Sequence, residues 1–198
     1  LMVNTGIHFT PSRMHAAVTD QDLLPKIYRT LDVYQKRVVD LGPFKHKVDD
    51  ALPLRKAALV CIDTLLGTPS LRSKLDVQEF MSRAVKLLGD DVEVKVQTHG
   101  VLRKLCTYGS TLVANQLEGL ITPLSATIQP KKALPEPGTG PEAERAWDVV
   151  KSACRLIVEL NGVNSRMGTL CRPWEDFYDR AVKMDKVGSI VISFVEGS

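Results

Sequence analysis

Residues 33–50 constrain the fold most, because they form the one stretch of this 198-residue chain that lacks a helical pattern. Two short runs with alternating or β-branched residues, 34–41 and 45–48, flank the dipeptide Gly42-Pro43. Glycine supplies backbone conformations that other residues resist, and proline fixes φ while lacking an N–H. Two such runs around a short loop predict a β-hairpin. Because an isolated hairpin is marginally stable in water, it needs support from adjoining helices or from a partner.

The rest of the chain predicts amphipathic helices joined by short turns, because apolar residues recur three and four positions apart. These helices are expected at about 11–31, 50–66, 77–88, 91–108, 110–128, 141–160, 173–181 and 186–195. A rhythm of paired helices is typical of repeats of about 40 residues that stack into a solenoid. The predicted fold class is therefore all-α, a HEAT-type solenoid of antiparallel helix pairs with one projecting hairpin.

Several local signals fix the expected helix ends and faces. Asp49 and Asp50 are expected to cap the helix after the hairpin, and Asn161-Gly162 to end the helix that begins at Pro141. The segment 129–141 contains four prolines and two glycines, so it is predicted to be a flexible surface loop. The apolar faces are expected to include Leu54, Ala58, Cys61, Ile62, Leu65, Val85, Val92 and Val96, with Trp147 and Trp174 in the core.

Composition is that of a globular protein, with 44% hydrophobic and 25% charged residues and a net charge of +3. The sequence lacks a dense basic stripe with interleaved aromatics, so nucleic-acid binding is not predicted. The sequence shows no signal peptide and no apolar run of transmembrane length, and its four cysteines are widely spaced. We therefore expect reduced, buried thiols and a location in the cytoplasm and nucleus. The chain is expected to form a single domain, residues 1–198, cut from a longer protein.

No catalytic residue, cofactor site or metal site is assigned from the sequence. The histidines, His8, His15, His46 and His99, are scattered, and no two of them have helical ligand spacing together with a carboxylate. An enzyme would need polar groups that converge from distant helices, and no local motif indicates them.

A basic cluster flanks the predicted turn and consists of Lys36, Arg37, Lys45 and Lys47. Lysines on an exposed strand protect its edge from aggregation, whereas the same charges could dock an acidic or mixed partner. Composition alone leaves these two interpretations about equally favoured.

The segment LGPFKHKVDDALPLRKAAL, residues 41–59, resembles the carboxy-terminal region of a known family. This is the family of cullin-associated, neddylation-dissociated proteins, also described as TATA-binding-protein-interacting. The similarity continues in the expected order through LPKIY at 24–28, DTLL at 63–66, LDVQEF at 75–80 and LITPLSAT at 120–127. It therefore covers nearly the whole chain.

This resemblance implies a non-enzymatic regulator of cullin–RING ubiquitin ligases. In the family, carboxy-terminal HEAT repeats occupy the amino-terminal end of an unmodified cullin, where substrate adaptors dock. A projecting hairpin competes with the adaptor and so promotes exchange of substrate-receptor modules in SCF-type ligases. TATA-binding protein is a further implied partner. Carried over by position, the partner-binding residues are Val38, Val39, Leu41, Gly42, Pro43, Phe44, Lys45, His46 and Lys47, with 41–44 at the tip.

An alternative keeps the fold and changes the partner. A HEAT or armadillo scaffold, or a nuclear transport receptor, would show a similar helical rhythm. Binding to cullin or TATA-binding protein would support the family resemblance, whereas binding to Ran or cargo would support a transport receptor.

Overall fold

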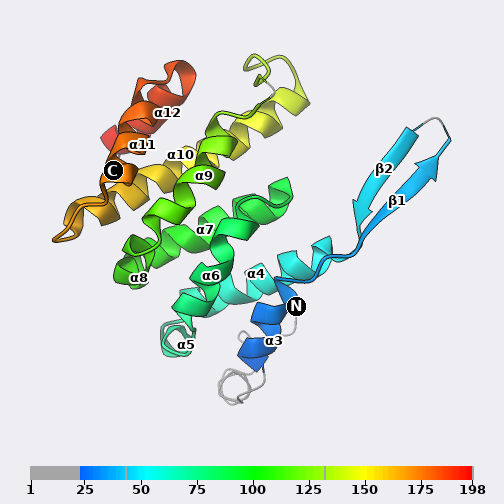
Figure 1. The fold of residues 1–198 in the computed structure, drawn as a ribbon, viewed down its shortest axis with the longest axis horizontal. Coiled ribbons are helices and arrows are strands. Elements are labelled where there is room, and N and C mark those ends of the chain that lie inside the picture. The colour runs from blue at the N-terminus through cyan, green and yellow to red at the C-terminus, as the bar shows by residue number, and fades with distance from the viewer. Residues whose placement is uncertain (1–22, 43, 132, 198) are drawn as a thin grey trace. The chain divides into compact units, whose positions relative to one another are not determined.

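The computed structural model of the chain describes residues 23–42, 44–131 and 133–197. Helices and one two-stranded antiparallel sheet make up the described secondary structure, which confirms the predicted all-α, HEAT-type fold class with one hairpin (Figure 1). Contacts divide the chain into two compact units, residues 1–83 and 84–198. The expectation of a single domain stays a prediction.

The described part of the first unit runs from α3 to the middle of α6. Its elements are α3 (Leu23–Thr30), β1 (Lys36–Leu41), β2 (Phe44–Asp49), α4 (Leu52–Gly67), α5 (Pro69–Arg72) and the start of α6 (Val77–Leu87). Helix α4 packs against α3 and α5, and buried Leu31, Leu59 and Ile62 form part of this core. The Tyr28 hydroxyl donates to the Asp76 carbonyl at 3.0 Å, which joins α3 to the residue before α6.

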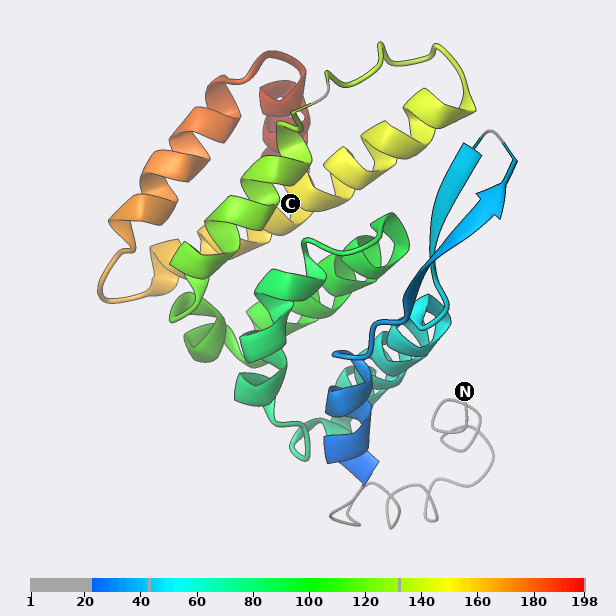
Figure 2. The same ribbon diagram turned by 45° about the vertical axis from the view of Figure 1, so that its right-hand side comes forward.

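The second unit is organised around its longest helix. It contains α7 (Val92–Tyr108), α8 (Ser110–Ala114), α9 (Leu117–Ile128), α10 (Pro141–Arg166), α11 (Arg172–Lys183) and α12 (Asp185–Glu196). Helix α10 contacts each of the other five (Figure 2). Trp147 and Trp174 are buried, as predicted, and the ring of Trp174 packs edge-on against Phe177 with centroids 5.3 Å apart. Large apolar side chains therefore fix the central helix and its neighbours.

Several predicted helix signals are confirmed. The Asp91 carboxylate accepts a hydrogen bond from Glu93 N at 3.0 Å and caps α7. Asp76 does the same for Glu79 N at 2.9 Å. Pro141 begins α10, where its missing N–H would have no helical partner. Of the helix predicted over 11–31, the part before residue 23 lies outside the described residues.

Two predictions about helix ends were wrong. Helix α10 continues through Asn161 and Gly162 to Arg166. A glycine inside a helix costs only about 1 kcal/mol relative to alanine, and burial of Val163 and Asn164 outweighs it. The Asn164 side chain also accepts a hydrogen bond from Cys171 N at 2.9 Å. The helix predicted over 110–128 is instead two helices, α8 and α9.

The predicted apolar faces were also partly wrong. Leu54 is 51% exposed, and Val85, Val92 and Val96 are exposed as well. Each fits the apolar spacing of its own helix, but the neighbouring helices cover a different stripe. On α7 that stripe is formed by Val94, Thr98, Val101, Leu102 and Leu105.

A buried histidine in the second unit makes its stability depend on pH. His99 in α7 is buried, and its Nδ1 lies 3.0 Å from the Ser152 hydroxyl in α10. Burial, with a smaller contribution from the Lys95 charge, lowers the pKa of His99 from 6.5 to about 4. Between these values the unfolded chain binds the proton more tightly than the folded chain. Folding stability therefore decreases as pH falls through this range.

We expect the free energy of unfolding to be about 2 kcal/mol smaller at about pH 5 than at about pH 7.5 because of this group. The His99→Gln variant keeps a polar partner for Ser152 but does not titrate, so its stability should change less over the same range. Urea denaturation at the two pH values measures both proteins. An equal pH dependence of stability in the parent chain and the variant would contradict the assignment of this dependence to His99.

Candidate functional site

The hairpin forms as the sequence predicts, with strands six residues long and a two-residue loop between them. β1 and β2 pair from Lys36 with Asp49 at the base to Leu41 with Phe44 beside the loop. Gly42 has φ of 79°, a conformation that side-chain-bearing residues rarely adopt. Glycine at the first position of a two-residue loop suits the twist of paired strands. The ladder extends away from α3 and α4 (Figure 1).

Asp49 joins the end of β2 to both segments that flank the hairpin. Its Oδ1 accepts hydrogen bonds from Gln35 N at 3.0 Å and from Ala51 N at 3.1 Å. Asp50 N donates to the Gln35 carbonyl at 3.0 Å and closes the base. The hydrogen bond from Gln35, together with Arg55 and the bond from Ala51, holds the pKa of Asp49 below its usual value. The prediction that Asp49 and Asp50 cap α4 was wrong, because Ala51 occupies the N-cap without a side-chain bond.

Arg55, from the first turns of α4, lies under the hairpin and is only 1% exposed. One guanidinium nitrogen donates to the Val33 carbonyl at 2.8 Å, and another forms an ion pair with Asp49 at 2.9 Å. The guanidinium also lies 4.1 Å from the centre of the Tyr34 ring. A buried arginine needs such partners, because a charge left unpaired in the interior is costly. Arg55 therefore fixes the entry and the exit of the hairpin to α4.

A second arginine braces the base from the surface. Arg37 in β1 donates to both carboxylate oxygens of Asp50, at 2.5 and 3.1 Å. The two side chains are 59% and 43% exposed, so this pair contributes little to overall stability. Its two-point geometry nevertheless orients the first residues of the ladder.

The predicted partner-binding residues lie on this ladder. Val38 is 60% exposed, Val39 is half-buried, and Lys45, His46 and Lys47 are exposed. Leu41 and Phe44 pair with each other next to Gly42. Pro43 lies outside the described residues. The support that Tyr34, Asp49 and Arg55 give to the hairpin was not predicted from the sequence. Arg55 is followed by Lys56 in α4, so nothing in the local sequence marks it as a buried residue.

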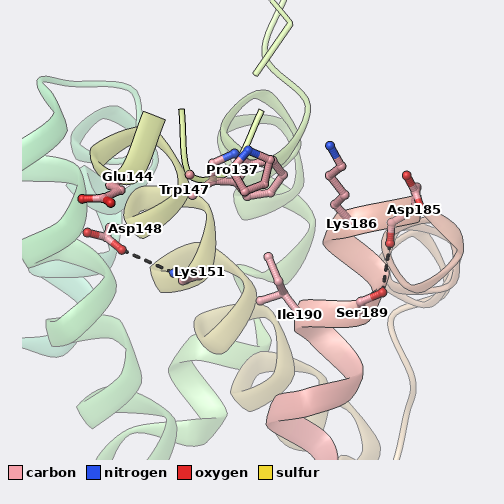
Figure 3. Close-up of a pocket in the computed structure, with 10 residues that line it drawn as sticks. Pro137, Glu144, Trp147, Asp148, Lys151, Asp185, Lys186, Ser189 and Ile190 are labelled. Carbon is pink, nitrogen blue, oxygen red and sulfur yellow. Dashed lines mark hydrogen bonds and ion pairs between the residues drawn. The ribbon is translucent and has the colours of Figure 1, made fainter. Parts of the chain in front are cut away.

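A second candidate is a pocket of about 630 Å³ in the second unit, between the loop before α10 and the first turns of α10 and α12 (Figure 3). Trp147 and Ile190 line it, and the Trp147 indole donates to the Pro135 carbonyl at 2.8 Å. Lys186 on its wall forms an ion pair with Glu136 of the loop. These contacts join the loop to both helices, which favours a structural role for the pocket's polar groups.

Nucleophiles and metal ligands do not converge in the described residues. Burial raises the pKa of the Cys106 and Cys154 thiols to about 12, which keeps them protonated. Within the described ranges, no group of three His, Cys, Asp or Glu side chains could hold a metal ion. No helix found there combines the length and apolar character needed to cross a membrane.

Comparison with known proteins gives a consistent result. The family model described as TATA-binding protein interacting (TIP20) matches residues 17–182. Cullin-associated NEDD8-dissociated protein 2 of Mus musculus is 32% identical over 79% of this chain. The corresponding protein 1 of Arabidopsis thaliana is 33% identical over 82% of the chain, and that of Dictyostelium discoideum is 30% identical over 71%. The chain spans 12%, 13% and 11% of these relatives' lengths, respectively. It belongs to the TATA-binding protein interacting family.

Proposed function

We propose that the chain is a non-enzymatic interaction module that binds an unmodified cullin at its amino-terminal, adaptor-docking end. In this proposal the hairpin overlaps the adaptor's footprint, and the helices supply further contact. Competition then promotes exchange of substrate-receptor modules in SCF-type ubiquitin ligases, in the cytoplasm and nucleus. The names of three relatives, which describe cullin association, support the choice of partner.

The observation that carries the proposal is a hairpin that extends from the helices and is fixed at its base. At the base, contacts of Arg55, Asp49 and Gln35 join the start of β1 and the end of β2 to α4 and to each other. A pre-ordered hairpin loses little conformational entropy when it binds, so it can displace a competing segment effectively. A mobile loop with the same residues would have to be ordered first.

The proposal predicts mutually exclusive binding. The 198-residue chain should bind an immobilised cullin amino-terminal domain, and saturating adaptor should lower the bound fraction by about tenfold or more. Surface plasmon resonance with and without adaptor measures this, with TATA-binding protein and Ran as parallel test surfaces. Cullin binding that adaptor leaves unchanged would contradict the competition. Binding to Ran alone would favour the transport-receptor alternative.

A further inference from the structure

The two faces of the hairpin carry different chemistry. Alternation along paired strands places Val38 and Lys47 on one face and the next pair, Val39 and His46, on the other. We name the first set the lysine face; it consists of Lys36, Val38, Asp40, Lys45, Lys47 and, at the base, Asp49. The opposite set is named the valine face; its described side chains are Arg37, Val39, His46 and Val48.

The lysine face is the more available of the two. Val38 is 60% exposed, whereas Val39, the next residue, is half-buried. Lys45 and Lys47 are exposed, and in the described part of the chain neither forms an ion pair. On the valine face the charge of Arg37 is already engaged with Asp50. A partner that meets the lysine face therefore encounters two exposed lysines that form no ion pair with any described residue, with one carboxylate, that of Asp40, across the ladder from Lys45.

Protection of a strand edge explains the lysines but does not explain the exposed Val38 among them. Edge protection favours charged side chains and disfavours exposed apolar ones. Val38 is the most exposed of the large hydrophobic residues described, and it lies directly across the ladder from Lys47. An apolar centre with a charged surround is instead the usual arrangement of a binding patch.

We infer that the lysine face is the docking surface of the hairpin, and that it fits an acidic protein surface with an apolar depression for Val38. This inference rests on the proposed function, since it describes the chemistry of the cullin surface that the hairpin would contact. The valine face then turns away from the partner. Charges of this kind increase the rate of association and the specificity of a complex, and salt screens them.

Two double variants test the choice of face, because they make similar changes in adjacent pairs of the ladder. Val38→Thr with Lys47→Gln alters the lysine face, and Val39→Thr with His46→Gln alters the valine face. Threonine keeps the β-branched shape in both. The first variant should need about tenfold more protein for half-displacement of adaptor from cullin, and the second less than about twofold more. Raising salt from about 50 to 300 mM should weaken displacement of adaptor by the parent chain more than displacement by the Lys45→Gln/Lys47→Gln variant.

The outcomes separate this inference from the proposed function. Equal losses in both double variants, or a larger loss from the valine face, would overturn the choice of face while adaptor competition stood. No loss in either variant would also overturn it, provided that a chain with a shortened hairpin fails to displace adaptor. If that shortened chain displaces adaptor normally, the role of the hairpin in the proposed function fails as well. Circular dichroism of each variant establishes that the helices remain folded.

Discussion

Replacing residues 39–46 with Asn-Gly should strongly weaken displacement of adaptor from cullin. In the register, Val38 pairs with Lys47, so the two new residues would close a hairpin directly between them. Asn-Gly is a preferred sequence for a two-residue hairpin loop. The variant keeps the base with Asp49, Asp50 and Arg55, and it removes only the outer part of the ladder. We expect at least a tenfold loss of displacement potency, about 1.4 kcal/mol, in a fluorescence assay of adaptor release.

The control for this variant is a charge change away from the hairpin. Lys74→Glu with Lys183→Glu alters two exposed lysines outside the ladder and should leave displacement within about twofold of the parent chain, because long-range charges are screened. Unchanged displacement by the shortened chain would mean that the helices compete with the adaptor without the hairpin.

Arg55→Met should lower the free energy of unfolding by on the order of 3 kcal/mol. Methionine keeps an unbranched apolar chain, but the Val33 carbonyl loses its 2.8 Å donor and the Tyr34 ring loses its cation. Loss of a buried charged donor costs about 1–3 kcal/mol, and loss of a desolvated cation–π contact adds up to about 2 kcal/mol. Urea denaturation measures the total. Hydrogen exchange should show faster exchange at Ala51 and Asp50, whose amides close the hairpin base.

Arg37→Met is the matched comparison, because Arg37 also pairs with an aspartate at the base but lies on the surface. Its stability should stay close to that of the parent chain. A similar loss of stability in the two variants would show that burial of Arg55 has no special importance. An Arg55 variant with reduced stability but unchanged adaptor displacement would show that the fixed base does not aid competition.

The hairpin was predictable because its signal is local. The loop at Gly42-Pro43 interrupts the helical pattern, and the flanking alternation fixes the strands to within two residues of their observed ends. Helix starts at Asp91 and Pro141 were predictable for the same reason, since a cap depends on its own turn.

The support of the hairpin was not predictable, because it depends on contacts between segments. Leu54 fits the apolar spacing of α4 yet is exposed, while the next residue, Arg55, is buried. Helical periodicity treats an arginine as a solvent-facing residue, and only the position of Tyr34 and Asp49 above α4 makes burial favourable. The predicted end of α10 at Asn161-Gly162 was wrong for the same reason, because packing around Val163 outweighs the local stop signal.

Photo-crosslinking from the hairpin identifies the protein surface that the ladder contacts. A benzoylphenylalanine at position 40, where the exposed Asp40 lies on the lysine face, would react with whichever protein contacts the ladder. We expect crosslinks to the adaptor-docking end of unmodified cullin, and we expect excess adaptor to remove them. Crosslinks confined to another part of the cullin, or crosslinks at that end that adaptor leaves unchanged, would contradict the proposed function.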